Sequence, residues 1–258
     1  MKNKVILVAP AIKIQFWKEF YKNVIQNDCD IEIIFVGHRE PNFNLPANFH
    51  YIYSKERPTL CAEIAYNKAY ELGGDYIQNT ADDCLYSANH FDKLISAIKK
   101  EEEKYSKDEL IMVGPASYNG DQLNIMALFP DRDHWDKDSR GGACRRAGGT
   151  EEDLGCDGEG PTLPTGNFSS IETSKKLGGI DTRYHALYWD CDQAMICHSM
   201  GGKVLIYPKE IVPPVIERKK SNSTLWGRFG RQDYNLLTSL WDVRSHDGET
   251  WTVKRKIQ

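Results

Sequence analysis

The chain has 258 residues, of which 40% are hydrophobic and 27% charged, and its formal net charge is −4. This composition supports a sizeable buried core and excludes the fibrous and intrinsically disordered classes. A negative net charge gives no whole-chain attraction to nucleic acid or anionic membranes, so any basic contact surface has to be local.

The first half of the chain alternates short apolar runs with segments of helical period. Apolar runs predict strands over residues 5–9, 31–36, 49–53, 76–80, 110–113 and 125–129. Apolar positions three and four residues apart predict helices over residues 12–25, from Thr59 to Leu72, and from Ser87 onward. Such alternation predicts a mostly parallel sheet covered by helices, in which ligands bind at the carboxyl ends of the strands.

The second half is less regular. Periodicity stops over residues 131–164, where we expect either a mobile loop over the site or a disordered insert. Beyond it, the pattern predicts helices over 170–177, 190–200 and 231–241 and a strand over 203–207. No second domain is visible, so we expect residues 1–258 to form one domain with a helical C-terminal elaboration over 217–258.

The cysteines and the N-terminal residues bear on the cellular compartment. Seven cysteines occur, and no two of them form a CxxC pair. An odd count without that spacing favours a reducing compartment and disfavours structural zinc. The apolar run Val5–Ala9 is too short for a signal-peptide core, and no run approaches the length of about 20 residues that crosses a bilayer. We therefore expect a cytoplasmic protein.

Asp82 and Asp83 directly follow the predicted strand over residues 76–80. Adjacent carboxylates at such a strand end repel each other, and a divalent cation removes that cost. Mn²⁺ and Mg²⁺ take carboxylate, phosphate and water oxygens as ligands. The pair therefore indicates a metal site, unless it only starts a turn and caps the next helix. A third ligand is left open among His185, His198 and His246.

The motifs around these aspartates resemble the inverting nucleotide-sugar glycosyltransferases of the GT-A fold, of the broad family 2 type. The order runs from Asn67 on a helix through Gly73-Gly74 and a strand to Asp82-Asp83, then Gly166-Asn167-Phe168, Gly178-Gly179-Ile180-Asp181 and Trp189-Asp190-Cys191-Asp192. The resemblance covers about residues 4 to 210. The chain departs from the family where Thr80 and Trp189 replace acidic residues, and where His38 or Arg39 follows the second strand in place of an aspartate.

The resemblance implies a GT-A-like, Rossmann-like three-layer sandwich and a hexosyltransferase-like enzyme. Asp82 and Asp83 would hold Mn²⁺ or Mg²⁺ on the diphosphate of a nucleotide-sugar donor, and Asp190 would be the general base on the acceptor side. Donor contacts are implied for Pro10, Ala11, His38, Arg39, Arg57, Asn67 and Ala81. Acceptor-side positions are implied for Gly166, Asp181, Trp189 and Asp192.

Several alternatives stay open. The acceptor is a glycan, a lipid-linked sugar or a modified nucleic-acid base. The basic, aromatic segment over residues 217–231 either binds an anionic acceptor, such as a phosphate backbone, a lipid diphosphate or an anionic glycan, or packs on the domain. A nucleotidyltransferase would normally carry a glycine-rich loop after the first strand, which Pro10–Lys13 lacks. A non-catalytic nucleotide- or sugar-binding module is the third class, and Trp189 keeps it open. The donor sugar, its base and the oligomeric state are not specified.

Overall fold

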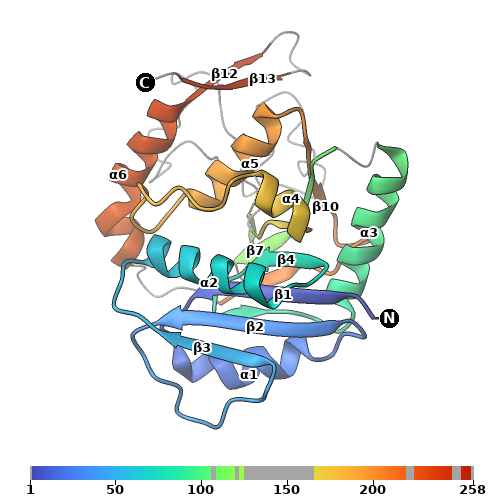
Figure 1. The fold of residues 1–258 in the computed structure, drawn as a ribbon, viewed down its shortest axis with the longest axis vertical. Coiled ribbons are helices and arrows are strands. Elements are labelled where there is room, and N and C mark those ends of the chain that lie inside the picture. The colour runs from blue at the N-terminus through green and yellow to red at the C-terminus, as the bar shows by residue number, and fades with distance from the viewer. Residues whose placement is uncertain are drawn as a thin grey trace.

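A seven-stranded sheet forms the centre of the computed structural model, which describes residues 2–105, 109–119, 122–124, 166–218, 224–245 and 251–256. The strand order is β10-β6-β9-β4-β1-β2-β3 (Figure 1). The strands are β1 (Lys4–Pro10), β2 (Asp30–Gly37), β3 (Phe49–Tyr53), β4 (Tyr76–Asn79), β6 (Ile111–Pro115), β9 (Phe168–Ser170) and β10 (Lys203–Tyr207). Neighbours pair in parallel except at β9, which is antiparallel to both β4 and β6. The predicted mostly parallel sheet is confirmed.

Helices cover both faces of this sheet. The helices are α1 (Ile14–Val24), α2 (Pro58–Leu72), α3 (His90–Lys104), α4 (Ile171–Lys176), α5 (Trp189–Ser199) and α6 (Thr224–Leu240). Side chains alternate along β1, so that Val5 and Leu7 pack in a cluster with α1 and α3, whereas Ile6 and Val8 pack in a cluster with α2, α4 and α5. The two clusters make the three-layer sandwich that the sequence predicts.

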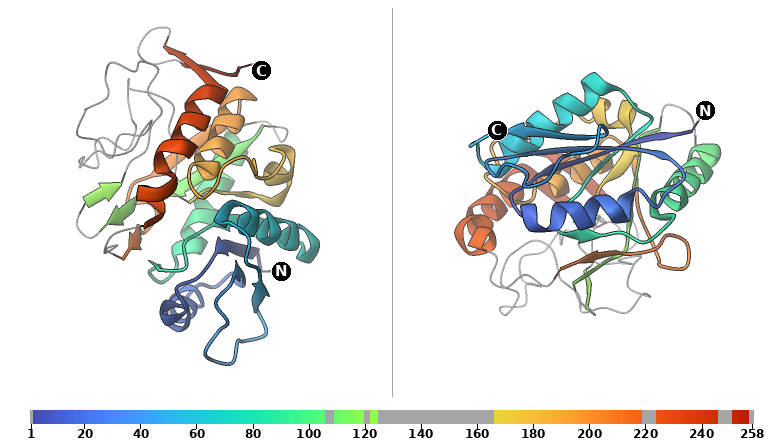
Figure 2. Two further views of the ribbon diagram at one scale, coloured as in Figure 1. Left: turned by 90° about the vertical axis from the view of Figure 1, so that its left-hand side faces the viewer. Right: turned by 90° about the horizontal axis from the view of Figure 1, so that it is seen from below.

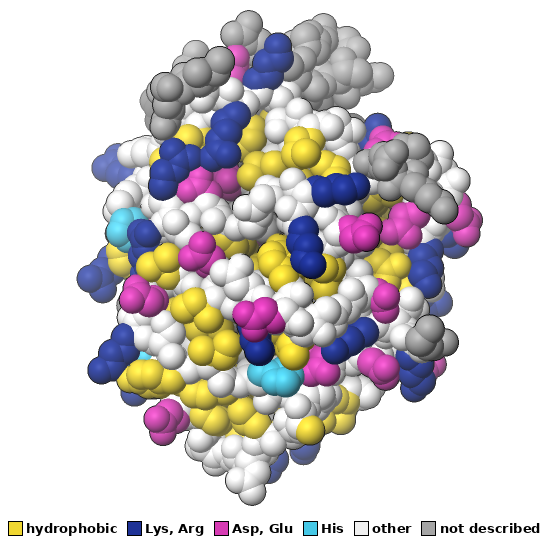
Figure 3. All heavy atoms as spheres, viewed as in Figure 1, with side chains coloured by type: hydrophobic (Ala, Val, Ile, Leu, Met, Phe, Trp, Pro, Cys, Tyr) yellow, Lys and Arg dark blue, Asp and Glu magenta, His cyan; other side chains and the backbone are white. Residues whose placement is uncertain are grey.

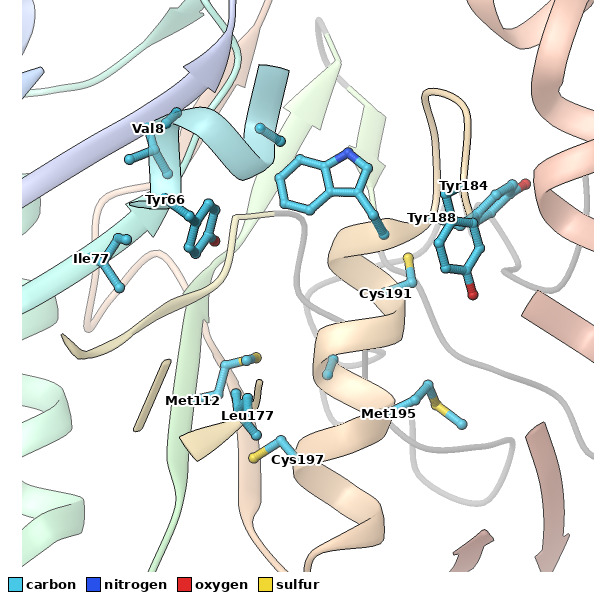
Figure 4. Close-up of a cluster of buried hydrophobic side chains, with 14 of the residues drawn as sticks. Val8, Tyr66, Ile77, Met112, Leu177, Tyr184, Tyr188, Cys191, Met195 and Cys197 are labelled. Carbon is cyan, nitrogen blue, oxygen red and sulfur yellow. The ribbon is translucent and has the colours of Figure 1, made fainter. Parts of the chain in front are cut away.

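Helix α5 is buried around most of its circumference. Its buried residues are Trp189, Cys191, Asp192, Gln193, Ala194, Met195 and Cys197. Figure 4 shows Cys191 and Met195 on this helix near Tyr184 and Tyr188, which precede it in the chain. Because the core holds α5 on several sides, the residues of its first turn have a fixed position relative to the sheet.

Two smaller sheets lie outside the central one. A four-stranded sheet has the order β5 (Cys84–Leu85), β11 (Val215–Glu217), β7 (Ser117–Asn119) and β8 (Gln122–Asn124). A hairpin of β12 (Trp241–Ser245) and β13 (Trp251–Arg255) follows α6 and lies at the end of the molecule remote from β3 (Figures 1 and 2). No helix in the described part of the chain is long and apolar enough to cross a membrane.

The structure departs from the predicted elements at a few positions. The third helix begins at His90 and not at Ser87, because Asn89 adopts a left-handed conformation with φ of 61° directly before it. A strand, β9, precedes α4, and the C-terminal segment contains a hairpin as well as a helix. The strand expected over residues 125–129 and the loop expected over 131–164 lie outside the described residues.

Candidate functional site

Asp82 fixes the turn between β1 and α1. Its Oδ2 accepts hydrogen bonds from the backbone N–H groups of Ile12 at 2.7 Å and Lys13 at 2.5 Å, and from Nε1 of Trp17 at 3.1 Å. Burial raises the pKa of Asp82, while the hydrogen bonds from Lys13 and Trp17 oppose that rise. Because β1 and β4 are parallel neighbours, Asp82 joins their carboxyl ends, where sheets of this type bind ligands.

The two carboxylate oxygens of Asp83 differ in their contacts. Its Oδ2 forms an ion pair with Nζ of Lys13. Its Oδ1 is buried and has no hydrogen-bond partner among the described residues. A buried acceptor without a donor costs about 1–3 kcal/mol, and more when it is charged. The second oxygen of Asp83 is therefore a position that favours a cation or a donor from outside.

Three amide oxygens on β4 and the segment before β9 share this property. Oε1 of Gln78, Oδ1 of Asn79 and Oδ1 of Asn167 are buried and unpartnered within the described parts of the chain. The backbone N–H of Asn79 donates to the carbonyl of Asn167 at 3.3 Å, and a Cβ at Gly166 would lie 3.2 Å from Nε2 of Gln78. Since buried polar groups normally have partners, the end of β4 is suited to receiving polar groups of a ligand.

These residues fit a divalent cation that is shared with a phosphate. Asp82 and Asp83 supply hard carboxylate oxygens, and one of the four is buried without a partner among the residues described. The described residues contain no group of three or more His, Cys, Asp or Glu side chains that could hold a metal ion. An ion here would therefore complete its coordination with ligand oxygens and water, as Mg²⁺ and Mn²⁺ do in phosphate sites.

Asp190, in the first turn of α5, is linked to the end of β4 through Asn167. Nδ2 of Asn167 donates to the backbone carbonyl of Asp190 at 2.8 Å, and the carbonyl of Asn167 accepts from Asn79. Asn167 thus links the strand that leads to Asp82 with the first turn of α5. The carboxylate of Asp190 is half-buried, and its Oδ1 accepts the backbone N–H of Cys191 at 3.0 Å. The burial of Tyr66, assisted by the charge of Asp190, raises the pKa of that tyrosine.

The other residues predicted for the acceptor side are held by the protein itself. Oδ1 of Asp192 accepts hydrogen bonds from the hydroxyl of Tyr184 at 3.1 Å and from Nε1 of Trp241 at 2.7 Å. Asp192 is 1% exposed, and burial raises its pKa. Trp189 is 7% exposed and meets the ring of Tyr66 edge-on at 6.2 Å.

Asp181 lies in an ion-pair network ahead of α5. Its Oδ2 is 2.6 Å from Nη2 of Arg183 and 2.8 Å from Nη2 of Arg255. Partial burial acts to raise the pKa of Asp181, but hydrogen bonds and charge from Arg183, with the charge of Arg255, bring it below its usual range. These contacts connect the loop after α4 to the C-terminal hairpin.

Most residues predicted to contact the donor lie at the carboxyl edge of the sheet. The backbone N–H of Ala11 donates to the carbonyl of Val36 at 2.8 Å. A Cβ at Gly37 would lie 1.9 Å from the carbonyl oxygen of Ala11, so only glycine permits this approach. His38 and Arg39 follow Gly37 and are exposed, while Pro10 ends β1 and Ala81 directly precedes Asp82.

Arg57 and Asn67 face a different part of the molecule. The guanidinium of Arg57 donates to the carbonyl of Thr182. Asn67 lines a cavity of about 270 Å³ together with Tyr66 and Tyr70 of α2 and with Lys175 at the end of α4. The structure thus places both residues along the loop that follows α4.

The basic, aromatic segment over residues 217–231 is partly described. The guanidinium of Arg218 pairs with Glu19 and lies 4.4 Å from the centroid of the Phe16 ring. Phe229 stacks on His185 with centroids 5.3 Å apart. Both contacts pack the segment on the domain. On the face that Figure 3 shows, acidic and basic side chains intermingle without a field of one sign.

Comparison with known proteins identifies the fold. No family model and no curated protein sequence matches the chain. GalNAc-T7, in a structure with UDP, GalNAc and Mn²⁺, is similar with a TM-score of 0.60 and 15% identity over 93% of this chain and 48% of that one. A mannosyltransferase from Pyrobaculum calidifontis, in complex with GDP-Man and Mn²⁺, has a TM-score of 0.55 and 15% identity over 92% and 63% of the two chains.

A third similar structure is the 1–349 segment of S. aureus TarS, with a TM-score of 0.51 and 12% identity over 84% of this chain and 60% of that one. These structures are glycosyltransferases of the GT-A type. This chain has the GT-A fold. It spans between 48% and 63% of the length of these three solved chains. The predicted fold class is confirmed.

Sequence reasoning missed two residues of the site, Lys13 and Asn167. Lys13 contacts Asp83, which lies 70 positions away in the chain, and no local pattern reports such a pair. Asn167 was noted only as part of a Gly-Asn-Phe motif, although it joins β4 to α5. The sequence does carry one signal, the glycine directly before it, because glycine is favoured where the backbone adopts a positive φ, which is +149° at Gly166.

Proposed function

We propose that this chain is an inverting, metal-dependent glycosyltransferase that moves a sugar from a nucleoside-diphosphate-sugar to an acceptor hydroxyl. The observation that carries the proposal is the buried Asp82–Asp83 pair at the joined carboxyl ends of β1 and β4. One carboxylate oxygen of this pair has no partner within the residues that the structure describes. In a GT-A sheet this edge faces the donor. The similar structures that contain UDP or GDP-Man together with Mn²⁺ support the same assignment.

The donor half of the site is arranged around the β1–α1 turn. Asp82 holds the backbone of Ile12 and Lys13, so the turn presents a fixed surface to the nucleotide. Asp83 would hold Mn²⁺ or Mg²⁺ through its free oxygen. A divalent cation there would neutralise the negative charge that grows on the departing diphosphate, which is worth several kcal/mol.

The acceptor half is provided by α5. In the proposed reaction, the acceptor oxygen attacks the anomeric carbon on the face opposite the diphosphate. The bond between that carbon and the phosphate oxygen breaks, and the carboxylate of Asp190 takes the proton of the attacking hydroxyl. The transition state has oxocarbenium character, as in glycoside hydrolysis. Asn167 sets the position of Asp190 relative to β4, because it bonds both.

The acceptor we propose is a glycan or a lipid-linked sugar. The contacts of Arg218 with Glu19 and of Phe229 with His185 engage part of the basic segment within the domain, which weighs against a nucleic-acid acceptor. We assign the protein to the cytoplasm because its seven cysteines are an odd number and include no CxxC pair, which favours a reducing compartment.

The test is a panel of UDP-, GDP-, CDP- and dTDP-sugars incubated with the protein in Mn²⁺ and in EDTA. We expect slow hydrolysis of one donor class with Mn²⁺ and none in EDTA. The matching nucleoside diphosphate should raise the melting temperature only when Mn²⁺ is present, since a ligand of the native state stabilises it. Binding of a nucleotide-sugar without turnover of any donor in the presence of acceptor glycans would show a binding module instead.

A further inference from the structure

Lys13 places a positive charge beside the proposed metal position. Its Nζ pairs with Oδ2 of Asp83, while Oδ1 of the same carboxylate is buried and has no partner in the described part of the chain. The side chain of Lys13 is 33% exposed, whereas that of Asp83 is 4% exposed. The ammonium therefore closes the solvent side of a carboxylate that otherwise faces the protein interior.

A divalent cation and this ammonium compete for one carboxylate. An ion on Oδ1 with the ammonium still on Oδ2 would place three positive charges around a single negative one. In a partly buried site, where the effective dielectric constant is well below that of water, this arrangement is strongly repulsive. Asp82 gives limited relief, because its Oδ2 already accepts three hydrogen bonds.

The backbone of Lys13 is fixed, but its side chain can move. Asp82 holds the backbone N–H of Lys13 at 2.5 Å, so the turn stays in place when the ammonium leaves Asp83. Lys13 is also the residue directly before α1, where the helix presents its positive end to anions. A flexible side chain of four methylene groups at this point can reach a phosphate bound beside the turn.

We propose that Lys13 neutralises Asp83 in the free protein and moves to the donor's diphosphate when a divalent cation takes that carboxylate. This inference rests on the proposed function and adds a residue to it. Lys13 is then a donor-binding residue that links metal binding to diphosphate binding. Metal alone binds weakly because it must displace the ammonium. Metal together with a diphosphate binds well, because the phosphate charge receives the displaced ammonium.

The first test needs only the unmodified protein. Mn²⁺ binding is measured by electron paramagnetic resonance, first with Mn²⁺ alone and then with saturating UDP or GDP. We expect the affinity for Mn²⁺ to rise at least tenfold with the matching diphosphate, beyond the affinity of that diphosphate for Mn²⁺ in buffer. By thermodynamic linkage, Mn²⁺ should strengthen diphosphate binding by the same factor. Equal Mn²⁺ affinity with and without the diphosphate would overturn the proposal.

The second test removes the ammonium. Lys13→Gln should bind Mn²⁺ alone at least fivefold more tightly than the wild type, and should bind the diphosphate in saturating Mn²⁺ about tenfold more weakly. Lys18→Gln is the matched control, because Lys18 is an exposed lysine on α1, the helix that follows Lys13. This variant should behave as the wild type does in both measurements. Lys13→Arg keeps the charge and should restore the wild-type Mn²⁺ affinity, which separates this role from a loss of folding.

The outcomes separate this proposal from the function on which it rests. Unchanged Mn²⁺ affinity in Lys13→Gln, in a protein that still turns over a nucleotide-sugar, would overturn the role of Lys13 alone. Absence of turnover and of nucleotide binding in the wild type would overturn the proposed function. Diphosphate binding that is the same in EDTA and in Mn²⁺, yet is lost in Lys13→Gln, would show a fixed phosphate contact and contradict the exchange.

Discussion

Each half of the chain contains two buried aspartates, which we compare as two pairs. Asp82 and Asp83 lie in the first half, and Asp192 and Asp233 lie in the second. All four are at most 3% exposed. In each pair one carboxylate holds backbone N–H groups. Asp82 holds the β1–α1 turn, and Asp233 of α6 accepts from His185, Ala186 and Leu187 at 2.8, 2.8 and 2.9 Å. The other carboxylate of each pair keeps one oxygen without a partner among the described residues.

The two pairs differ in the groups that contact the carboxylate with the unpartnered oxygen, which is Asp83 in the first pair and Asp192 in the second. Asp83 pairs with a partly exposed ammonium at the carboxyl edge of the sheet. Among the described residues, Asp192 accepts hydrogen bonds from the neutral donors of Tyr184 and Trp241, within the core. Burial and an unpartnered oxygen therefore do not by themselves distinguish a ligand site from a structural one. The location at a strand end and a displaceable cation make the distinction.

The largest effect is expected at Asp83. Asp83→Asn should lower sugar transfer at least about 10³-fold, because a neutral amide binds a divalent cation poorly and metal stabilisation of the leaving group is worth several kcal/mol. Steady-state kinetics in saturating Mn²⁺ measure this. Asp192→Asn is the matched control, and we expect transfer per folded molecule within about threefold of the wild type. Equal losses in both variants would break the distinction between the two pairs.

Asp190 should follow with a loss of about 10²- to 10³-fold in transfer. Asp190→Asn keeps an oxygen for the backbone N–H of Cys191 but cannot take a proton at neutral pH. Donor binding, measured by calorimetry with Mn²⁺ and the nucleoside diphosphate, should stay within about twofold of the wild type. Full transfer activity in this variant would place the base elsewhere and remove the acceptor role of α5.

At Asp233 we expect a loss of stability and not of chemistry. Asp233→Ala leaves three N–H groups in the loop before α5 without their acceptor, which should cost about 3–4 kcal/mol in the free energy of unfolding. Urea unfolding measures this cost. Below the unfolding transition, the diphosphate should bind as in the wild type. A loss of diphosphate binding with unchanged stability would give Asp233 a role at the donor site.

The same comparison shows what the sequence could predict. The strands at residues 5–9, 31–36 and 49–53 and the helix ending at Leu72 followed from apolar runs and helical period, since both faces of the sheet are covered. Asp82 and Asp83 followed from their place after a strand. These features depend on neighbours in sequence. The GT-A fold confirms the mostly parallel sheet covered by helices, while the metal role of Asp82 and Asp83 stays a prediction.

The remaining features depend on contacts between distant segments. The three-residue strand β9 is too short to show a period, and its antiparallel pairing with β4 and β6 brings Asn167 to the site. The buried position of Asp192 depends on Trp241, which lies 49 positions away. The Lys13–Asp83 pair likewise joins two distant segments. The side chains of the candidate site are positioned by these long-range contacts, for which a single sequence has no periodic signal.

His90 is a buried titratable side chain, and its protonation should affect the stability of the fold. Its Nδ1 donates to the carbonyl of Pro213 at 2.7 Å, and burial lowers its pKa from 6.5 to about 4. Between these values the unfolded chain binds a proton that the folded protein does not, so stability falls as the pH drops from 6.5 to about 4. We expect a contribution of about 3 kcal/mol, fully present above pH 6.5. The difference in urea stability between the wild type and His90→Asn should shrink over this range, and a constant difference would contradict the lowered pKa.

The smallest effect is expected at Ser170, where β9 ends and α4 begins. Its side chain accepts a hydrogen bond from the backbone N–H of Thr173 at 3.0 Å, as a helix N-cap does. Ser170→Ala should reduce the free energy of unfolding by about 1 kcal/mol, and Ser170→Asp should retain most of that stability, because aspartate caps helices as well as serine. Transfer should be unchanged in both variants, because the cap fixes a helix of the second half and not the strand ends that meet the donor. A tenfold loss of transfer in Ser170→Ala with normal stability would show that β9 positions Asn167 through this cap, and that the second half contributes more to the donor side than its contacts indicate.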